Sequence, residues 1–503
     1  MTSDRYNAAR GTVLLGGQQI AVYVVYFTYA VILARILTPQ EVGKVSLLAA
    51  VLAIFGGLTQ LGLPTTAVQF ISGSLGRGDS LSVSAITKST SRLMLLSGGM
   101  GTAVAVILSP FIGNIAFGSE GTTLLVLTFL SGFLLDLTTL YGGYFLGAGM
   151  YAEAVLQNIL YVPLSRGLGL ALAFSGFRVE GIVIGWLLGG LATLLMSVNT
   201  WRGHHDSKDL YPIRRILAFS VPIFISSLVI LLQGWSDIAL LQAITGQFAT
   251  IGGYYLVVTS VGFLSILWTP LVSALYPVLS LSHAINDINA VTQKLNQALR
   301  LSISITLPIG ASLSVVAPTA LSIVYGQTYA QQATALMILS LTTTLSSQGA
   351  LLLAALQAVG KPRSVMAVVT IAFAIDVAVV VLTGRSFGTV GAALGRSLLS
   401  IATVSLSYLA LRAKIRATPW QGLRKAIPLA VGVSVPLAAF GQLVHGVPPL
   451  LEIPILLGLF ALCFAILARE LNAFRPEDWE ILIAGLPTRF RKHGAFAHRI
   501  LTR

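Results

Sequence analysis

The sequence is poor in charge and almost free of cysteine. Only 10% of its 503 residues are charged, and its one cysteine is Cys463. A soluble domain carries roughly a quarter charged residues. A single cysteine excludes internal disulfides and cysteine-rich metal clusters. Apolar residues instead make up 55% of the chain, and the mean hydropathy is +0.86. This balance indicates a membrane protein.

The sequence also lacks the motifs of soluble enzymes. It contains no glycine-rich phosphate loop, zinc-binding helix motif or nucleophile elbow, and no polar segment long enough to be a domain that hydrolyses ATP. The histidines and acids in WRGHHDSKDLYPIRRI (201–216) fit a solvated loop better than a metal site. We therefore expect a protein that is not an enzyme, with no catalytic residue, cofactor or metal, in which any pumping depends on ion gradients.

Apolar runs long enough to cross a bilayer recur along the chain. About 20 apolar residues cross the hydrocarbon core as a helix. The first run is too long for the apolar region of a cleaved signal peptide and has no small-residue cleavage site. The sequence thus predicts an all-α polytopic membrane protein with about 14 transmembrane helices. The predicted spans are 12–34, 45–70, 93–117, 121–146, 154–176, 179–200, 216–244, 250–278, 301–325, 330–358, 364–384, 388–411, 426–446 and 449–468.

The basic residues are distributed unevenly between the predicted loops. With the N-terminus inside, 25 of the 31 Lys and Arg fall in cytoplasmic segments, and two lie inside spans. Because Lys and Arg mark cytoplasmic loops, we expect both termini on the cytoplasmic side. The net charge of +14 is then a sign of topology and of attraction to anionic lipid, and it requires no nucleic acid. The opposite face holds the other four: Arg35, Lys44, Arg178 and Arg385.

A weak internal repeat divides the chain. An offset of 210 places EGIVIGWLLGGLATLLMS (180–197) on VGAALGRSLLSIATVSLS (390–407), and an offset of 209 places VGKVSLL (42–48) on IGGYYLV (251–257). The first span then matches the seventh, so the halves have the same orientation and a pseudo-two-fold axis along the membrane normal. The predicted parts are an N-lobe 1–200 (spans 1–6), a cytoplasmic inter-lobe linker 201–215, a C-lobe 216–412 (spans 7–12), an extra helix pair 413–469 (spans 13–14) and a basic cytoplasmic tail 470–503.

Small residues recur every four positions in the sixth and twelfth spans. Such spacing lets helix backbones approach closely, so we interpret these glycines as helix-packing residues. They are Gly181, Gly185 and Gly189 in the first lobe, and Gly391 and Gly395 in the second.

Ionisable residues inside spans are costly and are functional candidates. Two interpretations stay open. The charges form salt bridges within each lobe, Asp136 with Arg166 and Asp376 with Arg396, or an arginine faces a central cavity and holds an anionic headgroup, because its planar fork binds phosphate bidentately.

Three acids are candidates for gating or ion coupling: Asp136, Asp237 and Asp376. Polar residues of the first and seventh spans either line a hydrated cavity or form interhelical hydrogen bonds. They are Gln18, Gln19, Tyr26 and Gln233.

A short stretch after the first span carries a family resemblance. LARILTPQEVGKVSLL (33–48) resembles the A-R-x-L-x-P-x-E-x-G-x-x-x-L pattern of the polysaccharide and oligosaccharide flippases (O-antigen flippase-like), members of the multidrug/oligosaccharidyl-lipid/polysaccharide exporter superfamily. DIALLQAITGQFATIGGYYLV (237–257) and GKPR (360–363) are similar to later elements of that family, the first with looser spacing. Thr38-Pro39 should end the first helix, Pro39 to Glu41 should form a short interfacial turn, and Gly43 should permit a close approach.

The resemblance implies that the chain moves a polyprenyl-pyrophosphate-linked oligosaccharide from the cytoplasmic to the outer leaflet of the plasma membrane, by alternating access, for cell-surface polysaccharide biosynthesis. Spans 13–14 would help to form a groove for the lipid tail. The expected partners are this substrate, the bilayer and other glycan-assembly membrane proteins, and the expected state is a monomer. The candidate headgroup-binding residues are Arg35, Arg166 and Arg396.

Two other functions compete with this one. An ion-coupled multidrug or small-cation exporter of the same superfamily would have fewer spans and an acid-lined cavity, which the internal arginines argue against. A membrane glycan polymerase or glycosyltransferase needs a large outer loop or a catalytic domain, whereas the predicted outer connections are short.

Overall fold

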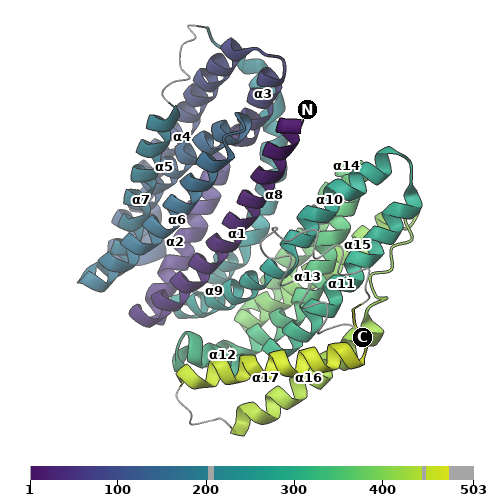
Figure 1. Cartoon of the computed structure of the whole chain (residues 1–503). Coiled ribbons are helices and arrows are strands. Elements are labelled where there is room, and N and C mark those ends of the chain that lie inside the picture. The colour runs from purple at the N-terminus through teal and green to yellow at the C-terminus, as the bar shows by residue number, and fades with distance from the viewer. Residues whose placement is uncertain (1, 202–208, 444–448, 475–503) are drawn as a thin grey trace. The chain divides into compact units, whose positions relative to one another are not determined.

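The computed structural model describes residues 2–201, 209–443 and 449–474, and these are mostly helical (Figure 1). Contacts divide the chain into two compact units, Met1–Tyr255 and Leu256–Arg503. The first unit includes α8 (Ile213–Thr245), which follows the predicted linker, because α8 packs on α2 and α3. Parts of the predicted linker and tail, 202–208 and 475–503, lie outside the described residues. The predicted lobe boundaries stay predictions.

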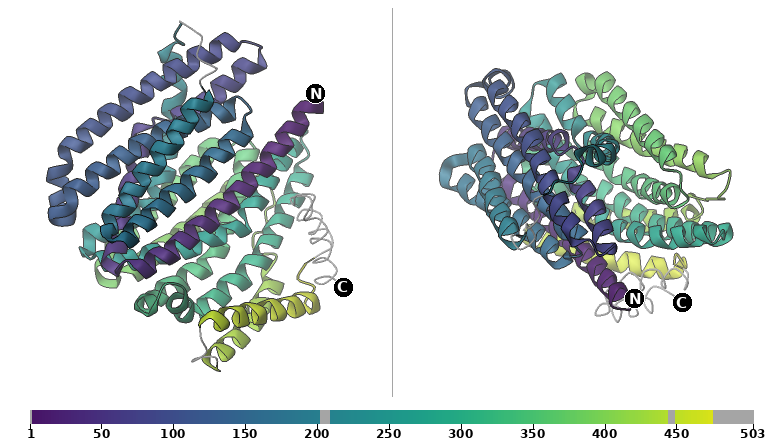
Figure 2. Two further views of the ribbon diagram at one scale, coloured as in Figure 1. Left: turned by 60° about the vertical axis from the view of Figure 1, so that its left-hand side comes forward. Right: turned by 90° about the horizontal axis from the view of Figure 1, so that it is seen from above.

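Long helices that pack side by side build the first unit (Figures 1 and 2). The main packing pairs are α6 with α7, α4 with α5, α5 with α7 and α1 with α6. The elements are α1 (Thr2–Ile36), α2 (Pro39–Thr59), α3 (Leu63–Gly76), α4 (Ser80–Phe117), α5 (Gly121–Gly147), α6 (Tyr151–Leu172), α7 (Arg178–Trp201), α8 and the first half of α9 (Phe248–Phe263).

The second unit is built in the same manner. Here α14 packs on α15, α11 on α13 and α16, and α16 on α17. Its elements are the second half of α9, α10 (Thr269–Ala284), α11 (Ile288–Val315), α12 (Ala317–Val324), α13 (Ala333–Ala358), α14 (Pro362–Phe387), α15 (Thr389–Leu411), α16 (Leu423–Leu443) and α17 (Pro449–Glu470).

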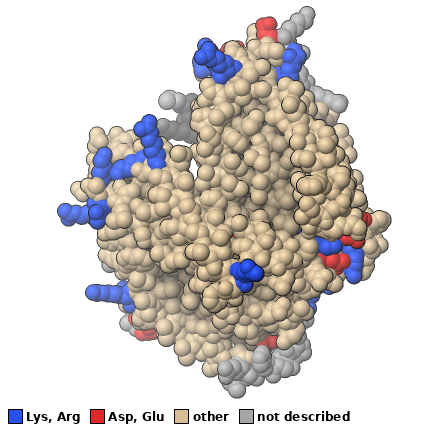
Figure 3. Space-filling view, turned by 180° about the vertical axis from the view of Figure 1, so that it is seen from behind, with Lys and Arg blue, Asp and Glu red and all other residues tan. Residues whose placement is uncertain are grey.

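Eleven helical runs in the described residues are long and apolar enough to cross a membrane. Two of them, Leu81–Gly147 and Tyr151–Trp201, each contain two of the helices above, so fewer runs than helices are counted. On α4 the side chains of Ile107, Phe111 and Ile115 are strongly exposed at four-residue spacing, as expected for a face that contacts lipid. Charged side chains are sparse on the face in Figure 3. The chain is a multi-pass membrane protein; the count of fourteen spans stays a prediction.

At least three predicted spans are broken helices, and one of them, 301–325, is interrupted at Val316 between α11 and α12. Span 45–70 is interrupted between α2 and α3, where Leu61 and Gly62 both adopt positive φ angles, 49° and 70°. Span 250–278 is interrupted at 264–268, between α9 and α10. Such breaks free backbone polar groups inside the membrane, and these groups need partners within the protein.

The stretch after α1 differs from the expected interfacial turn. The helix α2 begins directly at Pro39, and Thr38 is its N-cap. The Thr38 side chain accepts a hydrogen bond from the Glu41 backbone N–H, and the Glu41 carboxylate accepts one from the Thr38 N–H at 2.8 Å. This reciprocal capping box starts a helix sharply, which leaves no room for a separate turn.

The glycines at four-residue spacing are packing residues, as predicted. A Cβ on Gly185 would lie 2.2 Å from the backbone N of Gly169 on α6, and one on Gly189 would lie 2.5 Å from the Cα of Ser165. In the second unit a Cβ on Gly395 of α15 would lie 2.6 Å from Asp376 Oδ1 on α14. The second helix of each pair therefore lies against the first with almost no side chain between them.

The substitution Gly185→Ala tests this packing. The added methyl group meets backbone atoms that cannot rotate away, so we expect the free energy of unfolding to fall by about 1–3 kcal/mol, measured as a lower melting temperature in detergent. The matched control is Gly167→Ala on α6, where nothing lies within 4 Å of the new Cβ. Equal melting temperatures for the two variants would contradict the close contact.

Candidate functional site

Arg166 lies on α6 among aromatic rings. Its guanidinium carbon is 5.3 Å from the ring centre of Tyr26, 5.1 Å from that of Tyr29 and 4.9 Å from that of Trp186. A cation within about 6 Å of a ring face is attracted by the ring's quadrupole. We call these four residues the Arg166 cluster.

The local sequence explains how the cluster forms. Tyr26 and Tyr29 are three residues apart on α1, so they share a helix face, and α1 packs on α6. Trp186 follows Gly185, whose missing side chain lets α7 approach α6. The three rings therefore reach Arg166 from two neighbouring helices.

Three polar atoms of the cluster are buried and form no well-aligned hydrogen bond, although the Tyr29 hydroxyl lies close enough to Arg166 and Trp186 to interact with both. They are Arg166 Nε, Tyr29 Oη and Trp186 Nε1. The side chains of Tyr29 and Trp186 are only 3% and 1% exposed. Because buried polar groups are nearly always hydrogen-bonded, unpaired donors around an unneutralised cation favour a ligand that accepts hydrogen bonds and carries negative charge.

Asp136 does not pair with Arg166. Its carboxylate on α5 is fully buried and accepts hydrogen bonds from Thr59 Oγ1 and, at 2.9 Å, from Gln60 Nε2. No salt bridge in the described residues joins Arg166 to a carboxylate. The predicted salt bridge between Asp136 and Arg166 is therefore not formed. Asp136 instead accepts hydrogen bonds from the hydroxyl and amide at the α2–α3 break, and Arg166 instead faces the aromatic rings.

Asp237 connects α8 to α9. It is fully buried, and its Oδ2 accepts a hydrogen bond from the Tyr254 hydroxyl at 2.9 Å, while its Oδ1 accepts one from the Ile238 N–H. Two donors on this carboxylate give it a structural role between the helices. Its predicted part in gating or ion coupling stays a prediction.

The second charged pair lies on α14 and α15. Asp376 is buried against Gly395, and Arg396 is partly buried. Both have interaction partners within the protein. The predicted salt bridge between them stays a prediction, and Arg166, which has three rings and no carboxylate beside it, is the candidate for an anion.

The remaining candidates do not join the Arg166 cluster, except Tyr26. Arg35 is exposed in the last turn of α1 and has a partner of its own. Near it, Glu41 pairs with Arg178 at 3.0 Å and Lys44 with Glu120 at 3.2 Å. Among the glutamines, Gln19 is exposed, whereas Gln18 and Gln233 are partly buried.

Sequence reasoning missed Tyr29 and Trp186 as partners of Arg166. The Tyr-x-x-Tyr spacing on α1 was the available signal, but it does not say which helix the two rings face.

The described ranges contain no group of three or more His, Cys, Asp or Glu that is placed to hold a metal ion.

Comparisons with known proteins agree on family and fold. Residues 8–283 match the family described as polysaccharide biosynthesis protein. No curated protein matches the chain. The solved structure of the lipid II flippase MurJ in an inward closed conformation is similar, with a TM-score of 0.71 at 15% identity, and the match covers 92% of this chain and 100% of that one.

Two transporters of the MOP superfamily are also similar. One is a multidrug resistance MATE family transporter in an inward-facing conformation, with a TM-score of 0.68 at 16% identity, covering 78% of this chain and 95% of that one. The other, from Pyrococcus furiosus, has a TM-score of 0.58 at 16% identity, covering 80% and 96%. At these identities the likeness shows the fold alone: the described helices have the fold of this superfamily.

Substitutions at Asp136 test its network. Asp136→Ala leaves the Gln60 amide and the Thr59 hydroxyl without their buried acceptor, so we expect the free energy of unfolding to fall by about 1–3 kcal/mol. Asp136→Asn keeps one acceptor oxygen and should lose less. Thermal unfolding in detergent measures both, and an Asp136→Ala variant as stable as the wild type would show that the network contributes nothing.

Proposed function

The chain belongs to the polysaccharide biosynthesis protein family, and on that premise we propose that it is a flippase that moves a polyprenyl-pyrophosphate-linked oligosaccharide from the cytoplasmic to the outer leaflet. The Arg166 cluster is the observation that carries the substrate class. Each of its three buried polar atoms can donate a hydrogen bond, beside a cation with no carboxylate, and the oxygens of a pyrophosphate are anionic acceptors.

The cluster can bind a phosphate group in a way that a free arginine could not. The rings hold the guanidinium in place, so less rotamer entropy is lost when an anion arrives. In a site of low dielectric, hydrogen bonds to an ionised acceptor are about twice as strong as neutral ones. Arg166, Tyr29 and Trp186 would then hold the phosphate, and the sugars would occupy hydrated space.

Transport follows from alternating access in this proposal. The headgroup binds from the cytoplasmic leaflet, the fold opens to the other side, and the polyprenyl tail stays in lipid. The protein supplies no catalytic group and no cofactor in this cycle. It acts as a monomer in the plasma membrane, with both termini in the cytoplasm, in the biosynthesis of a surface glycan.

Reconstitution tests the function directly. Purified protein is placed in liposomes with a labelled polyprenyl-pyrophosphate oligosaccharide, and an impermeant reagent reports which leaflet holds the glycan. We expect protein-dependent movement of the glycan and no uptake of a cationic dye under an ion gradient. Dye transport without glycan movement would favour the small-cation exporter instead.

The same assay tests Arg166. Arg166→Gln removes the cation, and because a charged hydrogen bond contributes about 1.5–3 kcal/mol, flipping should slow by roughly tenfold to a hundredfold. The control is Arg385→Gln, which removes an exposed charge at the end of α14. Equal rates for the two variants would remove Arg166 from the site.

Ring-preserving substitutions separate ligand binding from a structural role. Tyr29→Phe and Trp186→Phe keep an aromatic ring near the guanidinium but remove the hydroxyl and indole donors. Each should slow flipping by a few-fold, since a neutral hydrogen bond contributes about 1 kcal/mol. Tyr23→Phe on the same helix, outside the cluster, should leave the rate unchanged. If Tyr29→Phe and Trp186→Phe flip the substrate at the same rate as the control Tyr23→Phe, the hydroxyl and indole donors do not bind the ligand, and the rings serve only to support the arginine.

A further inference from the structure

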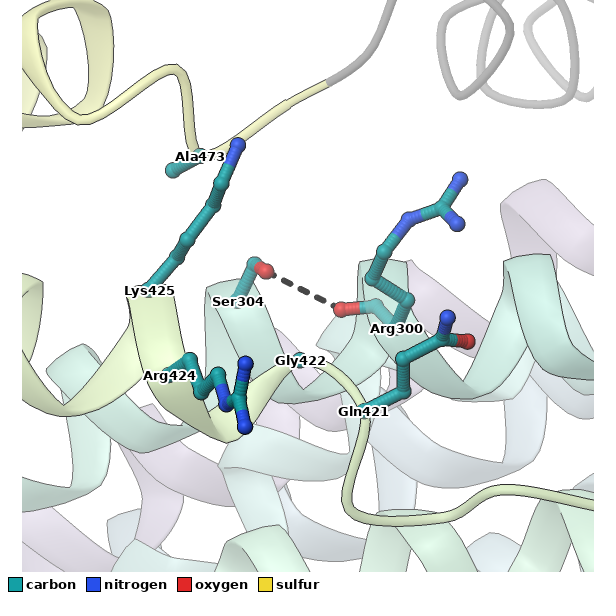
Figure 4. A pocket seen from close by; sticks show the side chains of 7 residues that line it. All are labelled: Arg300, Ser304, Gln421, Gly422, Arg424, Lys425 and Ala473. Atoms are coloured by element: carbon teal, nitrogen blue, oxygen red, sulfur yellow. Dashed lines mark hydrogen bonds between the residues drawn. The ribbon is translucent and has the colours of Figure 1, made fainter.

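A basic pocket in the second unit has no part in the proposed transport site. Its cavity has a volume of about 220 Å³ and lies between α11, the start of α16 and the residues after α17 (Figure 4). Three of its lining side chains are cationic, and no acid lines it among the described residues. The lining residues are Arg300, Ser304, Gln421, Gly422, Arg424, Lys425 and Ala473.

The pocket is held in shape by the connection between α15 and α16. Asn296 on α11 fixes this connection from both sides, donating to the Arg416 carbonyl at 3.0 Å and accepting from the Thr418 N–H at 2.7 Å. At Gly422 the chain touches α11, since a Cβ there would lie 2.3 Å from Ile303 Cγ2. Lys425 Nζ donates to the Asn472 carbonyl at 2.6 Å and so ties α16 to the end of α17. The Lys425 ammonium and the backbone that leads to Arg424 are therefore positioned by the fold.

A second cavity of about 520 Å³ adjoins the basic pocket and shares Gln421 and Arg424 with it. Its walls include the aromatic side chains of Tyr408 and Trp420. Trp420 is 50% exposed. Trp and Tyr gather at the level of lipid headgroups, where one side of the ring is apolar and the other is wet. The two cavities together offer cations next to aromatic rings.

We propose that the two cavities bind one anionic phospholipid. The phosphodiester lies in the basic pocket near Arg300, Arg424 and Lys425, and the glycerol and first acyl carbons lie along Trp420 and Tyr408. The basic residues assign this end of the unit to the predicted cytoplasmic side, where the leaflet is anionic and attracts Lys and Arg side chains near its surface. A free phosphate ion would fill the basic pocket but make no use of the aromatic cavity.

Quenching of Trp420 fluorescence tests the site. The full chain is reconstituted in phosphatidylcholine vesicles that contain a minor fraction of phosphatidylglycerol with brominated acyl chains, or the same fraction of brominated phosphatidylcholine. The Trp420→Phe variant identifies the signal of Trp420 among the six tryptophans. We expect brominated phosphatidylglycerol to quench Trp420 at a several-fold lower mole fraction than brominated phosphatidylcholine.

A charge-matched pair of variants shows whether the pocket is responsible. The double variant Arg300→Gln with Arg424→Gln should lower the preference for phosphatidylglycerol by roughly tenfold or more. The control, Arg412→Gln with Lys414→Gln, removes two exposed charges of the same connection that do not line the pocket, and it should keep the preference. If the first double variant does not fold, Arg424→Gln alone should show a smaller loss.

Three results would overturn the proposal. Equal quenching by the two brominated lipids would mean that no anionic lipid is selected. Equal loss in both double variants would assign the preference to general surface charge. Removal of the preference by millimolar inorganic phosphate, at constant ionic strength, would assign the pocket to free phosphate.

Discussion

The near-contact of α6 and α7 is the constraint on which the candidate site depends. Gly185 and Gly189 leave nothing between the two helices, and the indole of Trp186 is carried to the guanidinium of Arg166 as a result. A wider spacing would take the Trp186 ring away from the guanidinium and leave only the two tyrosine rings of α1 facing it. The close packing of α6 and α7 thereby determines the distance between the Trp186 ring and the Arg166 cation. Such packing has no hydrophobic driving force in lipid.

An unpaired polar group is costly inside a bilayer, and the buried carboxylates of the first unit have hydrogen-bond partners. Asp136 and Asp237 are buried, and both accept hydrogen bonds from neighbouring helices. The donors around Arg166 have no such acceptor. In a medium without water this difference is costly, and it separates the cluster from Asp136 and Asp237. The basic pocket of the second unit is a different case, because its cations Arg424 and Lys425 are exposed.

Apolar runs and residue spacing predicted the helical class and the packing role of the glycines, and the resemblance of residues 33–48 to a known pattern indicated the family, because these depend on residues close together in sequence. The hydrogen-bond partners of Asp136 could not be predicted from the sequence. Thr59 and Gln60 reach it from the point where α2 breaks, and the break depends on Leu61 adopting a positive φ angle, which its side chain disfavours. The Asp136–Arg166 pairing failed for a related reason: similar depth in the membrane does not fix the direction in which a side chain points.

The family-like stretch 33–48 contains a glycine, Gly43, whose neighbour is another helix backbone. A Cβ on Gly43 would lie 1.9 Å from the Phe248 carbonyl oxygen, and one on Gly252 would lie 2.5 Å from that of Pro39. At these two glycines α2 and α9 meet through backbone atoms, the arrangement in which Cα hydrogens can face carbonyl oxygens as weak C–H···O hydrogen bonds. Such a contact does not rely on the exclusion of water. It can persist when hydration of the surrounding helices changes during a transport cycle.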